Sequence, residues 1–191
     1  LMNAARYENE KSVELLLPKS DVKATDNRGN TALDIAKLYG YHQIFSLLQQ
    51  HTPLMEAVMN NDVDLVKSLL ANGNDVKATN NFGQTALMFA AASGNEKSVE
   101  LLLPKSDVNA TSDDGETALM AAAGSGNEKS VELLLPKSDV KASSNRGYTA
   151  LMKAARSGNE KSVELLLPKS DVKATDNFGQ TALMPAAGSG N

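Results

Sequence analysis

The sequence of 191 residues carries 19 Lys and Arg against 23 Asp and Glu, and its net charge of −4 gives it no general attraction to nucleic acids or anionic lipids. The absence of cysteine excludes disulfides, thiolate metal sites and cysteine nucleophiles, and agrees with a reducing compartment. No apolar run approaches the about 20 residues that a membrane span needs, and residues 1–3 do not begin a signal peptide. We therefore expect a cytoplasmic protein whose partner is neither a membrane nor a nucleic acid.

One sequence unit recurs along most of the chain. Its Thr-Ala-Leu-Met motif begins at Thr85, Thr117, Thr149 and Thr181, a spacing of 32 residues. Looser copies begin at Thr31 and Thr52. A fixed period of this size indicates a solenoid, in which each repeat is stabilised by its neighbours and the repeat is the unit to count.

The copy that begins at Thr117 predicts two helices in succession. Thr117 is a good N-cap for the Ala-rich and Met-rich first helix, and Gly126 can take the left-handed conformation that ends it. Asn127 can then cap a second helix from Glu128 to Leu135. The residues that share one face of this second helix are Val131, Leu134 and Leu135.

A turn-rich segment follows the second helix. Pro136 closes the helix, because its ring cannot continue the backbone hydrogen bonds. Residues 139–147 are rich in turn formers and have Gly147 near their end. This composition predicts an extended finger that leads to the next threonine.

These residues resemble the ankyrin repeat family. The family pattern of Asp-x-x-Gly-x-Thr-Pro-Leu-His-x-Ala-Ala, a Gly, a Val-x-x-Leu-Leu helix and an Ala-Asp-Val-Asn-Ala finger is similar to every repeat of this chain. The resemblance covers the whole chain and implies an all-α solenoid of stacked helix-turn-helix units with β-hairpin fingers. In two departures, Met88, Met120 and Met152 replace the family's His, and Pro-Lys-Ser replaces the usual four residues before the finger, which gives the period of 32 rather than 33.

The resemblance also assigns the parts of the chain, in an unusual order. Residues 1–50 are interpreted as a partial repeat plus a C-terminal-cap-like repeat. Residues 51–191 are interpreted as an N-terminal-cap-like repeat, three full internal repeats and a terminal half-repeat. Residues 183–191 align with residues 1–9, so the sequence would be a conventional capped array if residues 51–182 came before residues 1–50.

This order leaves two explanations open. The caps of such an array would lie about 50 Å apart, which the bond between Gln50 and His51 cannot span. Either residues 1–50 exchange between molecules, or the chain is permuted, fused or mis-ordered. Exchange through a head-to-tail contact would give rings or open fibres.

No catalytic, cofactor or metal-binding constellation stands out. The only histidines, His42 and His51, have no Cys and no second His at ligand spacing. Gly124 and Gly126 form a Gly-x-Gly, but without the further Gly or Lys of a phosphate-binding loop they indicate a helix C-cap. The acidic pair 113–114 offers too few ligands for a cation and is interpreted as part of a turn. We expect no enzyme activity, no cofactor and no bound metal.

Variation among the copies marks the candidate binding residues. Framework positions are nearly identical, whereas the finger tip, the residue after the tip glycine and two positions of the first helix differ from copy to copy. In ankyrin repeats these positions line the concave side on which partners dock, and exposed Phe, Tyr and Arg are favoured in interface hot spots. The candidate partner-binding residues are Phe82, Gln84, Phe89, Asp114, Glu116, Arg146, Tyr148, Lys153, Arg156 and Phe178.

These observations predict a protein-binding scaffold or adaptor that presents a concave surface of finger and first-helix residues to a protein partner. The alternative is a self-assembling structural repeat protein, in which residues 1–50 complete the open C-terminal end of another copy. Two residues depart from the repeat: Glu8 replaces a left-handed glycine, and Pro185 falls inside a first helix that we expect it to distort.

Overall fold

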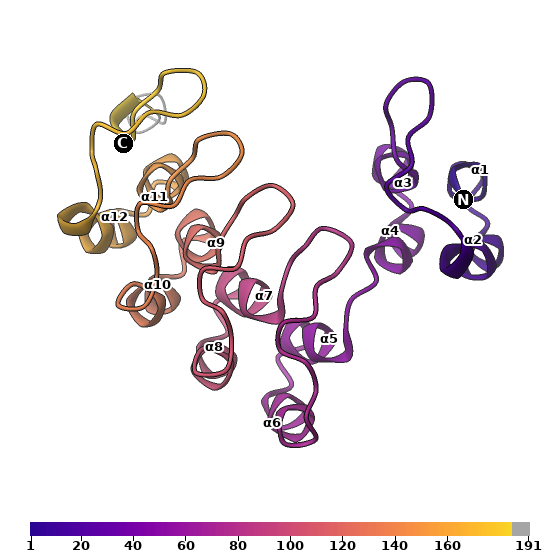
Figure 1. Ribbon diagram of the computed structural model, residues 1–191, viewed down its shortest axis with the longest axis horizontal. Coiled ribbons are helices and arrows are strands. Elements are labelled where there is room, and N and C mark those ends of the chain that lie inside the picture. Colours follow the sequence, from indigo (N-terminus) through magenta and orange to yellow (C-terminus); the bar gives the residue numbers. More distant parts are fainter. Residues whose placement is uncertain (185–191) are drawn as a thin grey trace. The chain divides into compact units, whose positions relative to one another are not determined.

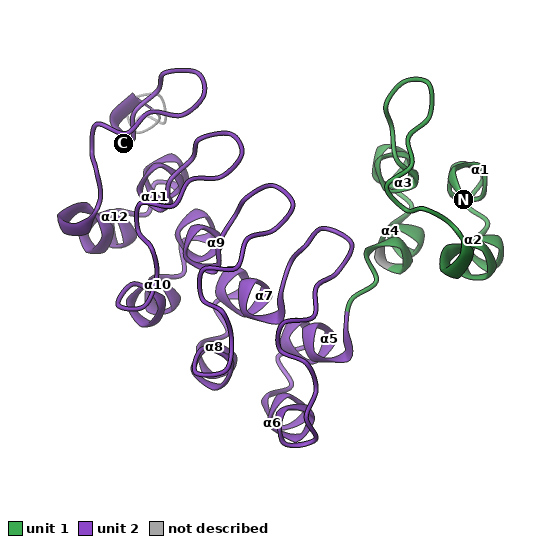
Figure 2. Cartoon of the chain, viewed as in Figure 1, with its two compact units in different colours: residues 1–51 green, residues 52–191 purple. Residues whose placement is uncertain are grey.

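The computed structural model describes residues 1–184, apart from the side chain of Ser46, and the chain divides into two compact units (Figure 2). These units are residues 1–51 and residues 52–191. The described residues form α-helices and short 3-10 helices and contain no β-strand, which confirms the predicted all-α fold class. No helix among them is both long and apolar enough to cross a membrane.

Residues 1–51 contain two helix pairs. The first pair is α1 (Met2–Arg6) with α2 (Glu10–Leu16), and the second is α3 (Ala32–Tyr39) with α4 (His42–Gln49). The 3-10 helix η1 (Leu17–Lys19) follows α2. α1 packs against α3 and α2 against α4. The helices bury a small apolar core of Ala4, Ala5, Val13, Ala32, Ile35, Ala36, Ile44 and Leu48.

The second unit is a stacked array of helix pairs. Its elements are α5 (Pro53–Met59), α6 (Val63–Ala71), α7 (Ala86–Ser93), α8 (Glu96–Leu102), α9 (Ala118–Ser125), α10 (Glu128–Leu134), α11 (Ala150–Ser157), α12 (Glu160–Leu166) and the 3-10 helix η2 (Leu167–Lys169). In Figure 1 the first helices of the pairs (α5, α7, α9, α11) follow one another in one row and the second helices (α6, α8, α10, α12) in another. The buried leucines of this core are Leu54, Leu87, Leu102, Leu103, Leu119, Leu134, Leu135, Leu151 and Leu166.

The first helices begin and end where the repeat motif predicts. The Thr117 hydroxyl accepts a hydrogen bond from the Met120 N–H at 3.3 Å, which satisfies one of the free donors at the start of α9. Gly126 ends α9 in the left-handed conformation, with φ of 76°. The predicted N-cap and C-cap of this helix are both confirmed.

The second helices bury the predicted face, but one predicted cap is wrong. Val131, Leu134 and Leu135 of the third pair are almost completely buried. Asn127 occupies the N-cap position of α10, yet its side chain makes no capping hydrogen bond. Its amide instead donates to the carbonyl oxygens of Ala91 and Ala92 in the preceding repeat, at 3.0 and 2.7 Å. The side chain therefore joins two repeats rather than closing its own helix.

The fingers are held by local turns rather than by β-ladders. Among the described residues the only bridge is an isolated one between Thr79 and Thr85, so the β-hairpin detail of the predicted fold is not confirmed. Side chains close the finger turns by accepting backbone N–H bonds. At Asp26, hydrogen bonds from the N–H groups of Asn30 and Arg28 lower the pKa of the carboxyl. The acceptors at this position of successive fingers are Asp26, Asn80, Ser112, Ser144 and Asp176.

Neighbouring fingers are joined at their tips. The Asn145 N–H donates to the Asp114 carbonyl at 2.8 Å, and the Asn177 N–H donates to the Arg146 carbonyl at 3.0 Å. Gly115 lies next to the contact between Asn145 and Asp114. A Cβ added there would lie 2.8 Å from the Asn145 backbone nitrogen, and its φ of 75° is also unfavourable for other residues. Only glycine permits both the turn and the close approach of the next finger.

The two departures from the repeat have different outcomes. Glu8 has a φ of 53°, so it does adopt the left-handed conformation that glycine takes in most other copies. Pro185 lies outside the described residues.

Gly124 and Gly126 provide a matched test of where the repeat requires glycine. A Cβ added at Gly126 would lie 2.8 Å from the Asn159 side chain, and the positive φ adds strain, so Gly126→Ala should destabilise the array by about 1–2 kcal/mol. Gly124 is exposed and helical, and an added Cβ would meet only Lys153 at 3.5 Å, an ordinary contact, so Gly124→Ala should stabilise by about 0.5–1 kcal/mol. Urea unfolding measures both. Equal changes in the free energy of unfolding for the two variants would contradict the assignment of Gly126 as a left-handed C-cap.

Candidate protein-binding grooves

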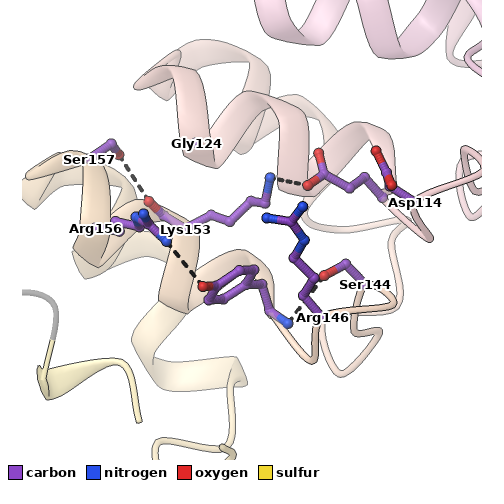
Figure 3. Close-up of a pocket in the computed structure, with 9 residues that line it drawn as sticks. Asp114, Gly124, Ser144, Arg146, Lys153, Arg156 and Ser157 are labelled. Carbon is purple, nitrogen blue, oxygen red and sulfur yellow. Dashed lines mark hydrogen bonds and ion pairs between the residues drawn. The ribbon is translucent and has the colours of Figure 1, made fainter. Parts of the chain in front are cut away.

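A groove lies between the first helices α9 and α11 and the fingers that precede them (Figure 3). Its volume is about 520 Å³, and we call it the α9–α11 groove. The preceding fingers contribute acidic, basic and aromatic side chains, and the helices contribute Gly and basic residues. Its lining consists of Asp114, Glu116, Gly124, Ser144, Arg146, Tyr148, Lys153, Arg156 and Ser157.

A finger residue and a helix residue hold each other in place on one wall. Arg156 donates from Nη1 to the Tyr148 hydroxyl at 3.0 Å, and the central carbon of its guanidinium lies 5.7 Å from the centre of the Tyr148 ring. The Tyr148 backbone N–H in turn donates to the Ser144 hydroxyl at 3.2 Å. Figure 3 shows this chain of contacts from finger to helix, which fixes both side chains before any partner arrives.

An ion pair crosses the groove between repeats. The Lys153 ammonium donates to the Glu116 carboxylate, although the two residues are 37 positions apart. Their side chains are 21% and 35% exposed, so the pair is partly screened from water. Each charge therefore largely neutralises the other. By contrast the exposed Arg146 side chain, which points into the groove in Figure 3, has no hydrogen-bond or ion-pair partner among residues 1–184.

A second groove continues the first one along the array. It lies between α7 and α9, has a volume of about 320 Å³, and we call it the α7–α9 groove. Glu116, Gly124 and Lys153 line both grooves. The other residues that line the α7–α9 groove are Gln84, Met88, Phe89, Ala92, Ser112, Thr117, Met120, Ala121 and Ser125.

The two grooves contain most of the candidate residues named from sequence. The α7–α9 groove includes Gln84 and Phe89. The α9–α11 groove brings together Asp114, Glu116, Arg146, Tyr148, Lys153 and Arg156. Phe82 and Phe178 line neither groove: Phe82 is half-buried at a finger tip where its carbonyl accepts from the Asp113 N–H, and Phe178 is 75% exposed. Whether any of the ten contacts a partner stays a prediction.

Sequence comparison missed some of the groove residues. Gly124 is a variable position between copies and lines the groove, but it was not among the candidate residues because it has no side chain. Ser157 lies at the end of α11, and its hydroxyl lies within hydrogen-bond distance of the Lys153 and Ala154 carbonyls of its own helix, at 3.1 Å each, and of the Ala123 carbonyl of the preceding repeat, at 3.2 Å. No signal in the sequence distinguishes this serine from the serines of the helix C-caps in other copies.

The second helices present a different, solvated surface. Lys129 and Glu132 form an ion pair of 2.8 Å on α10, and Lys161 and Glu164 form one of 3.0 Å on α12. The hydrogen bond with Glu132 raises the pKa of Lys129, and the same bond lowers the pKa of Glu132. Such exposed pairs contribute little to stability. Residues 1–184 hold no group of three or more His, Asp or Glu placed to bind a metal ion.

The repeat architecture agrees with a comparison to known families. The family model described as "Ankyrin repeats (3 copies)" matches residues 54–144 and 137–191. The chain belongs to the ankyrin repeat family. The described helix pairs and fingers from residue 54 onward are thus ankyrin repeats, and the two grooves lie on the first helices and fingers of these repeats.

Two curated proteins are similar to parts of this ankyrin repeat chain. Protein VAPYRIN-LIKE of Medicago truncatula is 36% identical over 87 residues, which is 45% of this chain and 19% of that protein. Ankyrin repeat and KH domain-containing protein mask of Drosophila melanogaster is 38% identical over 90 residues, which is 40% of this chain and 2% of that protein. The chain thus corresponds to less than a fifth of the length of either relative.

The ion pair across the α9–α11 groove can be measured with a double-mutant cycle. Lys153→Met, Glu116→Gln and the double variant should show a coupling free energy of about 0.5–1 kcal/mol in urea unfolding at low salt, because the pair is only partly exposed. The coupling should shrink in 1 M NaCl, where the Debye length is about 3 Å. Additive effects of the two substitutions at low salt would show that the pair is not formed in solution.

Proposed function

We propose that this chain is a protein-binding scaffold or adaptor, and that a partner docks on the two grooves formed by its first helices and fingers. Ankyrin repeats are in general modules of protein–protein interaction. The observation that carries the proposal for this chain is the joining of the α7–α9 and α9–α11 grooves into one lined surface, which gathers aromatic, acidic and basic side chains.

The mechanism is rigid presentation of side chains. Finger tips are joined by backbone hydrogen bonds, and Asn127 and Asn159 bridge successive repeats through their amides. Groove residues such as Arg156 are already held by Tyr148. Little conformational entropy is lost on docking when the binding residues are preorganised, so more of the contact free energy appears as affinity.

We assign no catalytic step and no cofactor to these grooves. Lys153 is paired with Glu116, and no serine or lysine in the grooves is paired with a histidine base. We place the binding function in the cytoplasm, an assignment that the absence of cysteine supports. The expected partner is a protein.

Alanine substitution at the predicted contact residues tests the proposal. Phe82→Ala, Phe89→Ala, Arg146→Ala and Tyr148→Ala should each weaken binding to a captured partner, with the largest losses about tenfold or more for groove residues, because aromatic and Arg side chains dominate interface energies. Affinity capture from the native cell supplies the partner, and titration calorimetry gives the affinities.

The matched control is Glu100→Ala, which changes an exposed side chain on α8, away from the grooves. It should leave binding unchanged, and circular dichroism should show that all variants keep their helix content. Unchanged affinity for all four groove and finger variants would refute the site assignment.

Self-association is a second candidate function, favoured by an apolar surface on α2. Leu16 is 41% exposed, whereas Leu102 and Leu134, the equivalent residues of α8 and α10, are fully buried. In this proposal, residues 1–50 of one copy complete the open C-terminal end of another. Light scattering from about 1 μM to 1 mM protein should then show mass increasing with concentration. A constant monomer mass over that range rules this candidate out.

A further inference from the structure

We propose that the two grooves together bind one extended peptide segment, with an acidic side chain in the α9–α11 groove and an apolar side chain three residues away in the α7–α9 groove. This inference rests on the proposed function and names the chemistry of the partner. The segment adopts a polyproline II conformation, because the distance between the two grooves matches three residues of that conformation.

The α9–α11 groove has unsatisfied positive charge. Lys153 is paired with Glu116, but Arg156 contacts only the neutral Tyr148 hydroxyl and ring, and Arg146 is exposed without a partner among the described residues. A guanidinium binds a carboxylate through two parallel hydrogen bonds, which are among the strongest polar contacts available to a protein surface. A carboxylate of the ligand fits beside these two arginines.

The carboxylate of Asp114 repels a ligand carboxylate, and its place in the groove therefore limits where the ligand carboxylate binds. Asp114 is exposed and forms no ion pair with Arg146 or Arg156. In Figure 3 it lies at the opposite end of the groove from Arg156. The ligand carboxylate therefore belongs at the end formed by Tyr148 and Arg156, away from Asp114.

The α7–α9 groove combines apolar side chains with polar ones, and it shares Glu116 and Lys153 with the α9–α11 groove. At the two positions where α11 carries Lys153 and Arg156, α9 carries Ala121 and Gly124, and α7 carries Phe89 and Ala92. Met88 and Met120 also line the α7–α9 groove, and Phe89 packs against the core while remaining half-buried. An apolar side chain gains free energy by leaving water at this site, at about 25 cal/mol per Å² of buried surface. These two first-helix positions thus change from apolar in α7, through small residues in α9, to basic in α11.

The repeat spacing sets the spacing of the ligand. Packed helices lie about 8–10 Å apart, so equivalent points of the two grooves are separated by about that distance. Polyproline II has three residues per turn and rises about 3.1 Å per residue, so residues i and i+3 lie on the same side about 9 Å apart. A β-strand would place residues i and i+3 on opposite faces. Polyproline II therefore directs both ligand side chains into the grooves.

Gly124 keeps the two grooves connected. It lines both of them, at the position where α11 has Arg156. A Cβ at Gly124 would meet only the Lys153 side chain, at 3.5 and 3.7 Å, so alanine fits without displacement. A longer side chain would occupy the passage between the grooves. Gly124→Gln should therefore block a continuous ligand, and Gly124→Ala should not.

Synthetic peptides test the proposal directly. The probes are two fluorescein-labelled peptides, Pro-Pro-Leu-Pro-Pro-Glu-Pro-Pro and its reversed-order form with Glu before Leu, measured by fluorescence anisotropy with the full chain. At least one should bind with a Kd below about 1 mM. Replacing Glu by Gln, replacing Leu by Ala, or removing one proline between them should each weaken that binding about tenfold.

Protein variants locate the binding site. Arg146→Gln and Arg156→Gln should each reduce the preference for the Glu probe over its Gln form about tenfold. Gly124→Gln should abolish binding, while Gly124→Ala, the matched control, should retain it. Circular dichroism melting confirms that each variant is folded. Equal affinity for the Glu and Gln probes, or no binding of either probe order, overturns the inference.

This inference and the proposed function fail in different ways. If a captured partner loses affinity on Phe89→Ala and Arg146→Ala but neither peptide competes with it, the grooves bind protein and the peptide chemistry is wrong. If the groove substitutions leave the affinity for the captured partner unchanged while the peptides bind as expected, the peptide site is supported. The assignment of the captured partner to these grooves is then wrong.

Discussion

The stacking of each repeat on its neighbours is the interaction on which the rest of this structure depends. α6, the longest helix among the described residues, has only nine residues, and isolated helices shorter than about 12–15 residues are marginal in water. The helices persist because residues such as Leu119, Val131 and Leu134 are shielded from water on every side by adjacent repeats. Residues in repeats that have a neighbour on both sides are therefore held more firmly than residues at the ends of the array. This favours functional surfaces on the repeats with two neighbours.

Polar contacts give this stacking its register. Apolar burial is non-directional, so by itself it would allow repeats to slide or rotate. The side-chain amides of Asn127 and Asn159 donate to carbonyls at the C-terminal end of the preceding first helix, and the Asn145 N–H donates to the Asp114 carbonyl beside Gly115. Each such bond stabilises modestly, about 1 kcal/mol. Their directionality fixes where Tyr148 and Arg156 lie relative to α9, and hence the width of the groove.

Local features of this fold were predictable from sequence, whereas contacts between distant residues were not. The Thr117 cap, the left-handed Gly126 and the buried face of the second helix follow from chemistry within a few residues, and all three were predicted correctly. At Asn127 the contacts that no local rule predicts are those of its amide NH2, which donates to carbonyls 35 and 36 residues away. The structure gives no reason why its oxygen leaves the cap unmade, since Asn159 makes both the inter-repeat bond and the cap. For the grooves, sequence comparison marked Lys153 and Glu116 as variable but could not show that they pair.

Because the repeats are nearly identical, the few side chains that differ between them determine what each groove can bind. When the framework is the same, a groove between two repeats differs from the next groove only through its variable side chains. Gly124 and Arg156 occupy equivalent positions, yet one opens a passage and the other supplies a charge. The binding surface therefore arises from combinations of neighbouring copies: Glu116 needs Lys153 from the following repeat, and Arg156 needs Tyr148 from its own finger. Changing the order of the repeats would change the surface without changing the fold.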